Sequence, residues 1–505
     1  MASAAAKRKI GAVLKGIEGR ASPSSAESLD TLAPRDGGYV LLIATVAVVS
    51  MVAPLNSTMI AVALPNIRAD FGVSHGQVAW LVSAYLIAMA VAQPLGGRLG
   101  DQVGRVKTLR FGLAAFFACS LAGALTPNFE SLVAFRAGQA LFGAAVIPNV
   151  LAMLRTSLPP HRLGEATGTF SSMAGLAAAL GPLLGAGLVE AGNWRWLFLA
   201  NLPLVGLALL SLMLLRYREA PGSQRLRLDF AGTLALAGLL TLFTLLVSAD
   251  GMTAPGWALA GAGLAALGAM FVWQQARAPV PLADWRLFRL RSFAASTVTV
   301  LLTNLGMYTT ALMLPFFAQE VQGRGAAAAG FLLATETILM AAASPLVGRL
   351  ADARGRRLPS QLGGVLQATG ALLLVVVISA DVSYALLAAC VMVQGLGFSL
   401  ALSPATAAAV ESAPREHAGA AAGTISMMRY LGSIAGVALL GGILSEGGAA
   451  PAVDTFRAVF ALLLVSGVAA AFAASMIHRF VGQDATTRPA VEGALGERAG
   501  ALEGR

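Results

Sequence analysis

The chain alternates between long apolar segments and short polar connections along most of its 505 residues. Each apolar segment is about 20 residues long, which is the length a helix needs to cross a hydrocarbon core. Backbone groups cannot bond to water inside hydrocarbon, so each segment is predicted to be a helix. We therefore expect an all-α, polytopic membrane protein with fourteen transmembrane helices. The predicted spans are residues 39–63, 77–97, 107–126, 131–153, 167–189, 196–215, 230–248, 256–274, 293–317, 326–347, 360–379, 383–408, 418–444 and 456–477.

Composition strengthens this prediction and excludes several classes of protein. Hydrophobic residues make up 57% of the chain and charged residues only 12%, about half the charged share of a soluble domain. Cys119 and Cys390 fall in separate predicted spans, so they offer neither a disulfide framework nor a metal site. No connection is long enough for a soluble domain of about 50 residues or more, and no GxxxxGK[ST] loop is present. We expect no ATPase domain, no enzymatic activity and no cofactor.

The distribution of charge predicts how the chain sits in the bilayer. The net charge of +10 could indicate a nucleic-acid partner, but the basic residues lie mostly in the short connections between the predicted spans. Nineteen Lys and Arg residues lie in or beside the connections that follow even-numbered spans, against four in the opposite connections. Basic connections face the cytoplasm, so both termini are predicted to be cytoplasmic, with tails at 1–38 and 479–505. The second tail is polar and is expected to be disordered. The bilayer is the expected partner, and nucleic acid is not.

A short segment occurs twice and indicates two related halves. Both copies follow an even-numbered span, and similar halves are the architecture of many transporters. The offset between them is longer than six spans require, which predicts an extra helix pair. The predicted units are 39–215, a six-helix bundle; 216–292, the extra pair and its linkers; and 293–478, a second six-helix bundle. The repeated residues are Gly97, Arg98, Leu99, Asp101, Gly104 and Arg105, matched by Gly348, Arg349, Leu350, Asp352, Gly355 and Arg356.

Five segments, in order, resemble signatures of the major facilitator superfamily, in particular its fourteen-span drug:proton antiporter branch. The segments are 55–65, 97–107, 132–139, 175–185 and 193–203. The resemblance covers about residues 38–478. It implies two six-helix bundles that rock about a central site, a small and lipophilic substrate, protons as the coupling ion, a bacterial inner membrane and a monomer.

Glu336 is the one acidic residue that lies well inside a predicted span. A charge at mid-bilayer costs several kcal/mol, and an apolar environment favours the neutral form of a carboxyl group. Glu336 therefore either binds protons or a cationic substrate, or is a protonated acid held by Thr335, Thr337 or a neighbouring helix.

Other polar residues in the spans are weaker candidates for the cavity. The resemblance implies that Arg136 acts in proton relay or conformational coupling, and the alternative is a structural tie to carbonyls or to Gln139. Asn56 stands where the family usually has an aspartate, so it can bind substrate or pack helices but cannot carry a proton. Arg429 either faces the cavity or snorkels to the cytoplasmic side. Asn149 either lines the cavity or makes an interhelical hydrogen bond.

The repeated loops and span five have mechanical interpretations. Aspartates in the loops can cap a helix and pair with arginines, which would make a latch that breaks when the cytoplasmic side opens; the alternative is a structural loop. Small residues and a proline in span five would seal the interface of the halves against proton leak, or simply allow packing. The residues are Gly97, Asp101, Gly104, Arg105, Lys107, Gly348, Asp352, Gly355 and Arg356 in the loops, and Gly175, Gly181, Pro182 and Gly185 in span five.

The predicted function is a secondary active transporter that exports hydrophobic or cationic drugs or antibiotics in exchange for protons. The neutral Asn56 keeps a second hypothesis open, a solute uptake permease or uniporter of the same fold. A receptor or sensor that transports nothing is the third.

Overall fold

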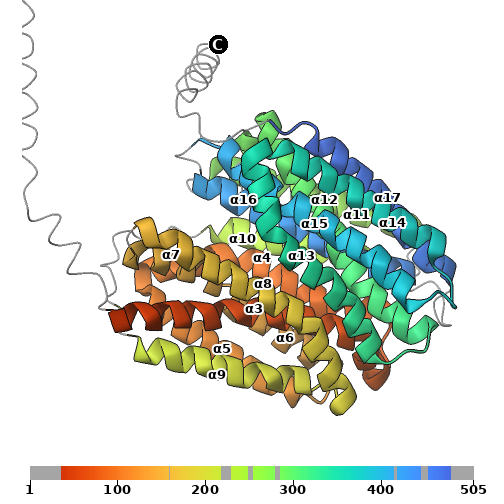
Figure 1. The fold of residues 1–505 in the computed structure, drawn as a ribbon, viewed down its shortest axis with the longest axis horizontal. Helices are drawn as coiled ribbons and strands as arrows, with labels where there is room; N and C mark the ends of the chain where they lie inside the picture. The colour runs from red at the N-terminus through yellow and green to blue at the C-terminus, as the bar shows by residue number, and fades with distance from the viewer. Residues whose placement is uncertain are drawn as a thin grey trace, which may run out of the picture.

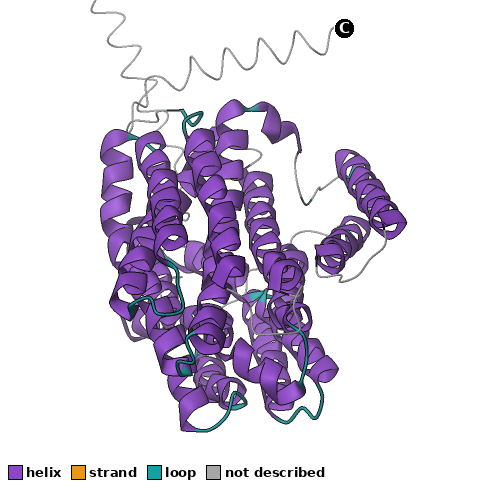
Figure 2. Cartoon of the chain, turned by 90° about the vertical axis from the view of Figure 1, so that its right-hand side faces the viewer, coloured by secondary structure: helices purple, strands orange, loops and turns teal. Residues whose placement is uncertain are grey.

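In the part of the chain that the computed structural model describes, all regular secondary structure is helical, and Figure 2 shows helices joined by loops, with no strand. Thirteen helical segments are long and apolar enough to cross a membrane, and a shorter apolar helix covers Ala231–Leu246. These segments coincide with the fourteen predicted spans, which confirms the all-α polytopic fold. The predicted tails lie almost wholly outside the described residues. The described residues are 36–158, 160–215, 217, 229–247, 254–278, 282, 285–414, 418–444 and 453–478.

The first six spans form one bundle. Its helices are α3 (Asp36–Phe71), α4 (His75–Val103), α5 (Arg105–Ala124), α6 (Phe129–Gly143), α7 (Val146–Ser157), α8 (Pro160–Ala191) and α9 (Trp196–Leu214). Span four consists of both α6 and α7, because the helix is interrupted between them. Helix α3 packs along α8, and α5 packs against α6 and α9. In Figure 1 this bundle runs from red to yellow-green.

The last six spans form the second bundle, which is green to blue in Figure 1. It follows the short 3-10 helix η1 (Trp285–Arg289). Its elements are α12 (Arg291–Phe316) with a π-helical extension η2 (Phe317–Val321), α13 (Ala326–Arg354), α14 (Arg357–Val377), α15 (Tyr384–Ser412), α16 (Ala418–Leu444) and α17 (Val453–Ala474). Helix α14 packs against α15 and α17, and α12 packs against α16.

The remaining two helices, α10 (Phe230–Val247) and α11 (Ala254–Arg277), form the predicted extra pair. Helix α10 contacts α4 of the first bundle and α16 of the second. Helix α11 packs mainly on α10, and nearly all of its apolar stretch is left partly or fully exposed. The pair therefore lies at the periphery of the two bundles and is not inserted between them. The residue boundaries predicted for the three units stay predictions.

The repeated loops make the same turn in both bundles. Gly104 ends α4 with a φ of 110°, and Gly355 ends α13 with a φ of 81°. Side chains with a Cβ rarely adopt such angles, so the repeated glycine is required by the turn itself. We call the end of the molecule with these two turns the arginine-rich end. The opposite end carries the turn between α3 and α4, where Ser74 and Gln77 form a capping box.

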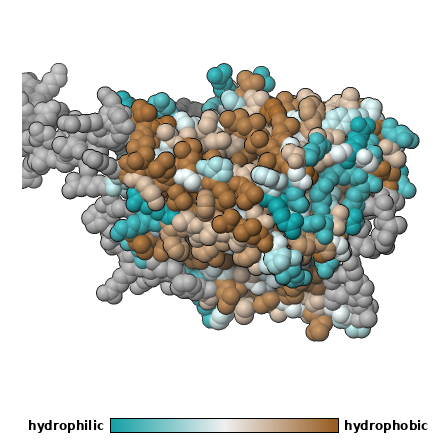
Figure 3. Space-filling model, turned by 90° about the horizontal axis from the view of Figure 1, so that it is seen from below, coloured by the Kyte–Doolittle hydropathy of each residue, from teal (hydrophilic) through white to brown (hydrophobic). Residues whose placement is uncertain are grey.

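The outer surface is apolar where the spans are exposed. Figure 3 shows a broad hydrophobic face, with hydrophilic side chains gathered mainly toward its ends. Large apolar side chains such as Phe111, Val376 and Phe472 are 65%, 72% and 65% exposed. A contiguous apolar surface of this extent is unfavourable in water and favourable in lipid.

Candidate functional site

Arg136 lies on α6 in the core of the first bundle and is only 1% exposed. Its Nη1 donates to Oε1 of Gln139 at 3.0 Å, and its Nη2 donates to the backbone oxygen of Asn56 on α3 at 2.9 Å. The guanidinium carbon lies 4.3 Å from the centre of the Tyr85 ring on α4. The buried Nε has no hydrogen-bond partner among the described residues. Arg136 therefore joins α3, α4 and α6 through neutral groups.

Asn56 and Gln139 extend this network to two more helices. Oδ1 of Asn56 accepts a hydrogen bond from Nδ2 of Asn201 on α9 at 3.0 Å. Nε2 of Gln139 donates to the hydroxyl of Ser120 on α5 at 2.8 Å. Three of the predicted candidates, Arg136, Asn56 and Gln139, thus belong to one buried network. Sequence reasoning assigned no role to Asn201 or Ser120, although Asn201 lies in the fifth signature segment.

The second bundle adds an arginine and two tyrosines to this network. Tyr308 on α12 interacts electrostatically with both Arg136 and Arg429. On α16, Arg429 lies beside the Tyr430 ring, 5.4 Å from its centre. The Tyr430 hydroxyl donates to Oε1 of Gln93 on α4 at 3.3 Å, which joins the bundles. We call this set the central cluster: Asn56, Tyr85, Gln93, Arg136, Gln139, Tyr308, Arg429 and Tyr430.

Glu336 lies apart from the central cluster, on α13 of the second bundle, and is 3% exposed. It packs against α15, where a Cβ at Gly395 would lie 2.8 Å from the Glu336 backbone oxygen. Its Oε2 is buried and has no hydrogen-bond partner within the described part of the chain. The neighbouring hydroxyls of Thr335 and Thr337 donate to backbone oxygens one turn earlier, not to the carboxyl group.

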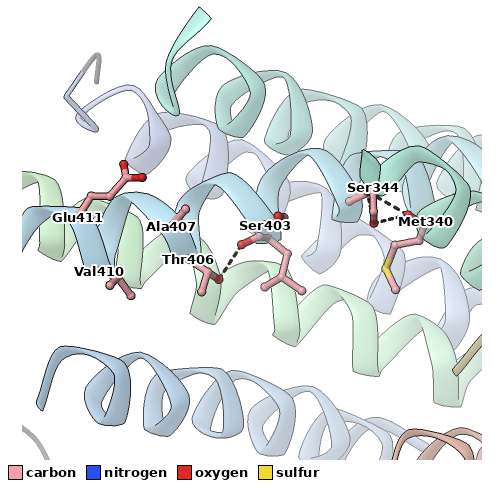
Figure 4. Close-up of a pocket in the computed structure, with 9 residues that line it drawn as sticks. Met340, Ser344, Ser403, Thr406, Ala407, Val410 and Glu411 are labelled. Atoms are coloured by element: carbon pink, nitrogen blue, oxygen red, sulfur yellow. Dashed lines mark hydrogen bonds between the residues drawn. The ribbon is translucent and has the colours of Figure 1, made fainter. Parts of the chain in front are cut away.

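A groove between α13 and α15 begins one helical turn beyond Glu336 and has a volume of about 580 Å³ (Figure 4). Met340 lines it nearest to Glu336, and Glu411 lines it at the arginine-rich end. Figure 4 shows lining residues from both helices spread along the groove. The lining is mainly apolar, and four of its residues carry hydroxyl groups: Ser344, Ser399, Ser403 and Thr406.

The first repeated loop ties helices of its own bundle together. Nη2 of Arg105 pairs with Oδ1 of Asp101 at 3.0 Å, and Nη1 donates to the Thr156 hydroxyl on α7 at 3.2 Å. A Cβ at Gly97 would lie 3.1 Å from Cβ of Pro148, so this glycine allows α4 to approach α7 closely. Lys107 is exposed at the start of α5.

The second repeated loop makes equivalent contacts within its own bundle. Nη1 of Arg356 pairs with Oδ1 of Asp352 at 2.7 Å, and Nη2 pairs with Oε1 of Glu411 on α15 at 2.9 Å. Arg356 donates hydrogen bonds to Glu411 and Asp352, and these bonds, that to Glu411 most, raise the pKa of Arg356 above its usual value. A Cβ at Gly348 would meet nothing within 4 Å, so close helix approach does not explain that glycine here.

Span five separates into two contact regions. A Cβ at Gly181 would clash with the Thr58 side chain, and one at Gly185 would lie 2.7 Å from the Met59 oxygen, so both glycines let α8 pack on α3. Pro182 faces the other bundle, where a Cβ at Gly330 would lie 2.6 Å from its backbone oxygen. A Cβ at Gly175 would meet nothing within 4 Å.

Asn149 makes interhelical contacts instead of lining the central cluster. Its Nδ2 donates to the backbone oxygens of Gly96 on α4 and Ala145 at 2.8 Å each. The side chain is 1% exposed. In this structure Asn149 therefore holds α7 against α4.

Polar contacts between the bundles at the opposite end were missed by sequence reasoning. Glu320 of η2 accepts from Nη2 of Arg68 at 2.8 Å and lies 2.9 Å from Nε2 of His75. Nearby, Oε1 of Glu190 on α8 accepts from the backbone N–H of Ala327 on α13 at 2.7 Å. The bundles are thus held together at this end, and the groove within the second bundle extends along α13 and α15 toward the arginine-rich end.

Two helical bundles of this size, joined around a largely buried polar cluster and surrounded by an apolar exterior, define a polytopic membrane transporter. Residues 46–437 and 297–501 match the family model of the Major Facilitator Superfamily. The chain belongs to this family, whose members are secondary transporters and not enzymes.

Several relatives from bacteria are similar over most of the chain. The chain is 31% identical to the uncharacterized MFS-type transporter YvkA of Bacillus subtilis, over 79% of this chain and 89% of that protein. It is 32% identical to multidrug resistance protein Stp of Mycobacterium tuberculosis, over 77% and 73%. It is also 32% identical to the tetracenomycin C resistance and export protein of Streptomyces glaucescens, over 79% and 75%.

Solved structures share the fold at low sequence identity. A crystal structure of the peptide transporter POT has a TM-score of 0.67 at 15% identity, covering 89% of this chain and 96% of that one. A bacterial homologue of the human lysosomal transporter Spinster has a TM-score of 0.61 at 13% identity, covering 88% and 98%.

Proposed function

We propose that this transporter exports lipophilic compounds, drugs or antibiotics among them, across a bacterial inner membrane in exchange for protons. The observation that carries the proposal is the carboxyl group of Glu336, which is buried in the second bundle with Oε2 lacking any partner in the described residues. Ionisable groups inside a membrane protein are costly and usually functional. Loss and gain of a proton change the charge of this carboxyl, so its protonation can be coupled to a change of conformation.

The groove beside Glu336 supports a route for the proton. It runs from Met340, one turn from Glu336, to Glu411 at the arginine-rich end, with hydroxyl groups spaced along a mainly apolar lining. We assign this end to the cytoplasm because basic connections face inward. Both termini are then cytoplasmic. Glu336 releases its proton into the groove when that side is open.

Alternating access would exchange the two sets of polar contacts. In this structure the bundles are joined at the opposite end by Glu320 and Glu190. Opening toward the outside breaks these contacts and brings the bundles together at the arginine-rich end. The loops around Arg105 and Arg356 then act as latches, and the contact of Pro182 with Gly330 acts as a seal against proton leak while the outer side is closed.

Export is supported by the multidrug resistance and export proteins among the relatives. The neutral Asn56, hydrogen-bonded by Asn201, favours the second candidate, an uptake permease or uniporter without proton coupling. The two candidates differ in whether a proton moves when substrate moves.

Inverted membrane vesicles that contain the protein, loaded with a pH-gradient dye, separate these candidates. Addition of lipophilic compounds is expected to dissipate the proton gradient, and vesicles without the protein serve as the control. Solute entry that is independent of the gradient, with no dye response to any compound of a broad panel, would contradict export and favour uptake.

A further inference from the structure

We propose that the central cluster binds aromatic compounds that carry a negative charge, such as a carboxylate or a phenolate. This assignment of substrate class rests on the proposed function, because it takes the cluster as the place where the exported compound binds. It narrows the substrate from lipophilic molecules in general to lipophilic anions with a flat ring system.

The first observation is an excess of positive charge. Arg136 and Arg429 both interact electrostatically with Tyr308, so this tyrosine lies within the field of two guanidinium groups, one from each bundle. The ion pairs recorded within the described ranges lie toward the ends of the bundles, and none includes either arginine. Glu336 makes no ion pair with them. Two guanidinium groups without an ion-pair partner attract a negative ligand, and the attraction is strongest at Arg136, which is 1% exposed, whereas Arg429 is partly exposed.

The second observation is a buried donor of the central cluster that has no acceptor among the described residues. Nη1 and Nη2 of Arg136 are satisfied by Gln139 and Asn56, but the buried Nε is not. A guanidinium group binds carboxylates and other oxyanions through adjacent N–H groups. An anionic oxygen of a ligand would supply the acceptor that the protein itself lacks there.

The third observation concerns the shape of the partner. Tyr85, Tyr308 and Tyr430 surround the two arginines from α4, α12 and α16. Tyrosine rings offer flat apolar faces for stacking together with hydroxyl groups for hydrogen bonds. Arginines stacked on tyrosines present the same flat geometry to a ligand. The combination favours a planar aromatic anion over a small inorganic one.

The cluster is also placed where a substrate must bind for alternating access. Tyr85 and Arg136 belong to the first bundle, and Tyr308 and Arg429 belong to the second. The contact of Tyr430 with Gln93 is the direct hydrogen bond between these two sides of the cluster. A ligand that replaces this bond would contact both bundles at once.

Two dyes with the same three-ring scaffold and opposite charge test the proposal. Binding of fluorescein, an anion at pH 8, and of rhodamine 123, a cation, is measured by fluorescence anisotropy with the purified full-length protein. We expect fluorescein to bind at least tenfold more tightly. Arg429→Gln should weaken fluorescein binding about tenfold and leave rhodamine binding unchanged or stronger. Tighter binding of rhodamine by the unmodified protein would overturn the proposal.

Further variants separate a binding role from a structural one. Arg429→Lys keeps the charge and should recover part of the affinity, and Tyr308→Phe tests the cluster without removing charge. Arg277→Gln removes an exposed arginine on α11 and should change nothing. Unchanged fluorescein affinity in a folded Arg429→Gln protein, or an equal loss in Arg277→Gln, would also overturn the proposal. Proton exchange driven only by cationic compounds would agree with proton-coupled export but refute the anion site. Fluorescein binding without any proton exchange would agree with the anion site but contradict proton-coupled export.

Discussion

At the scale of single residues, the guanidinium group of Arg136 organises the centre of the protein. It is held by a backbone oxygen, an amide and an aromatic ring, none of which carries charge. A buried charge without a counter-ion is destabilising unless hydrogen bonds and dipoles compensate it. Because none of these neighbours carries a charge that offsets that of Arg136, a single acidic substitution beside it would change the net charge of the site.

Asn56→Asp is such a substitution, and it should reverse the charge preference of the central cluster. The new carboxylate would lie on the residue whose backbone oxygen already accepts from Arg136. We expect fluorescein affinity to fall about tenfold or more, and rhodamine affinity to rise, because one positive charge is neutralised. Anisotropy titrations measure both. Unaltered affinities for the two dyes would show that Arg136 does not contribute to the binding of charge.

Sequence reasoning found the buried ionisable residues but not their partners. Glu336 and Arg136 stand out because charge is rare inside apolar segments. Tyr85 and Tyr308 carry no such signal, since an aromatic residue in a span is usually a packing residue. They are 223 positions apart, and only the fold brings them together.

At the scale of helices, close packing of α8 on α3 depends on glycines at defined positions. A Cβ at Gly185 would lie 2.7 Å from a backbone oxygen of α3, whereas one at Gly187, half a turn away, would meet nothing within 4 Å. The spacing of small residues in span five was evident from the sequence. Which of them face a neighbouring helix depends on how that helix is placed.

Gly185→Ala should therefore destabilise the protein, and Gly187→Ala should not. Overpacking of a rigid backbone contact costs about 1–3 kcal/mol, which is enough to lower the temperature of thermal unfolding in detergent by several degrees. Equal unfolding temperatures for the two variants would contradict the close contact between α8 and α3.

The ion pair of Glu320 with Arg68 and its hydrogen bond with His75 hold η2 against the ends of α3 and α4. Glu320→Gln removes the charge that joins Arg68 and His75. We expect the end opposite the arginine-rich end to open more often. A cysteine at Ala326, which is 4% exposed here, should then react with an impermeant maleimide up to about tenfold faster, in a background without Cys119 and Cys390. A tenfold change corresponds to about 1.4 kcal/mol.

Asp454→Asn is the matched control for that experiment. Asp454 pairs with Arg457 within α17 and joins no two bundles. The Asp454→Asn protein with the same introduced cysteine should be labelled at the rate of the protein that keeps Asp454. A Glu320→Gln protein that labels no faster than this control would show that these contacts of Glu320 do not keep the bundles closed.

At the scale of the whole molecule, two related bundles enclose a cationic centre and one isolated carboxyl group. The number of spans, the two halves and the extra helix pair all followed from apolar segments, basic connections and one repeated loop. The contacts between the bundles did not, because Arg68 and Glu320 lie 252 positions apart and look like ordinary charges near the ends of spans. Which charged residues pair between the bundles depends on the conformation of the protein, and the pattern of residues along the sequence does not predict it.

Proton-driven transport by purified protein in liposomes tests most directly whether Glu336 couples protons to export. With an imposed pH gradient, the unmodified protein and the control Glu130→Gln, which removes an exposed carboxyl group, should accumulate a transported compound against its concentration gradient. Glu336→Gln should bind the compound with similar affinity but only equilibrate it across the membrane. Accumulation by Glu336→Gln at the rate of the unmodified protein would contradict the role of this carboxyl group.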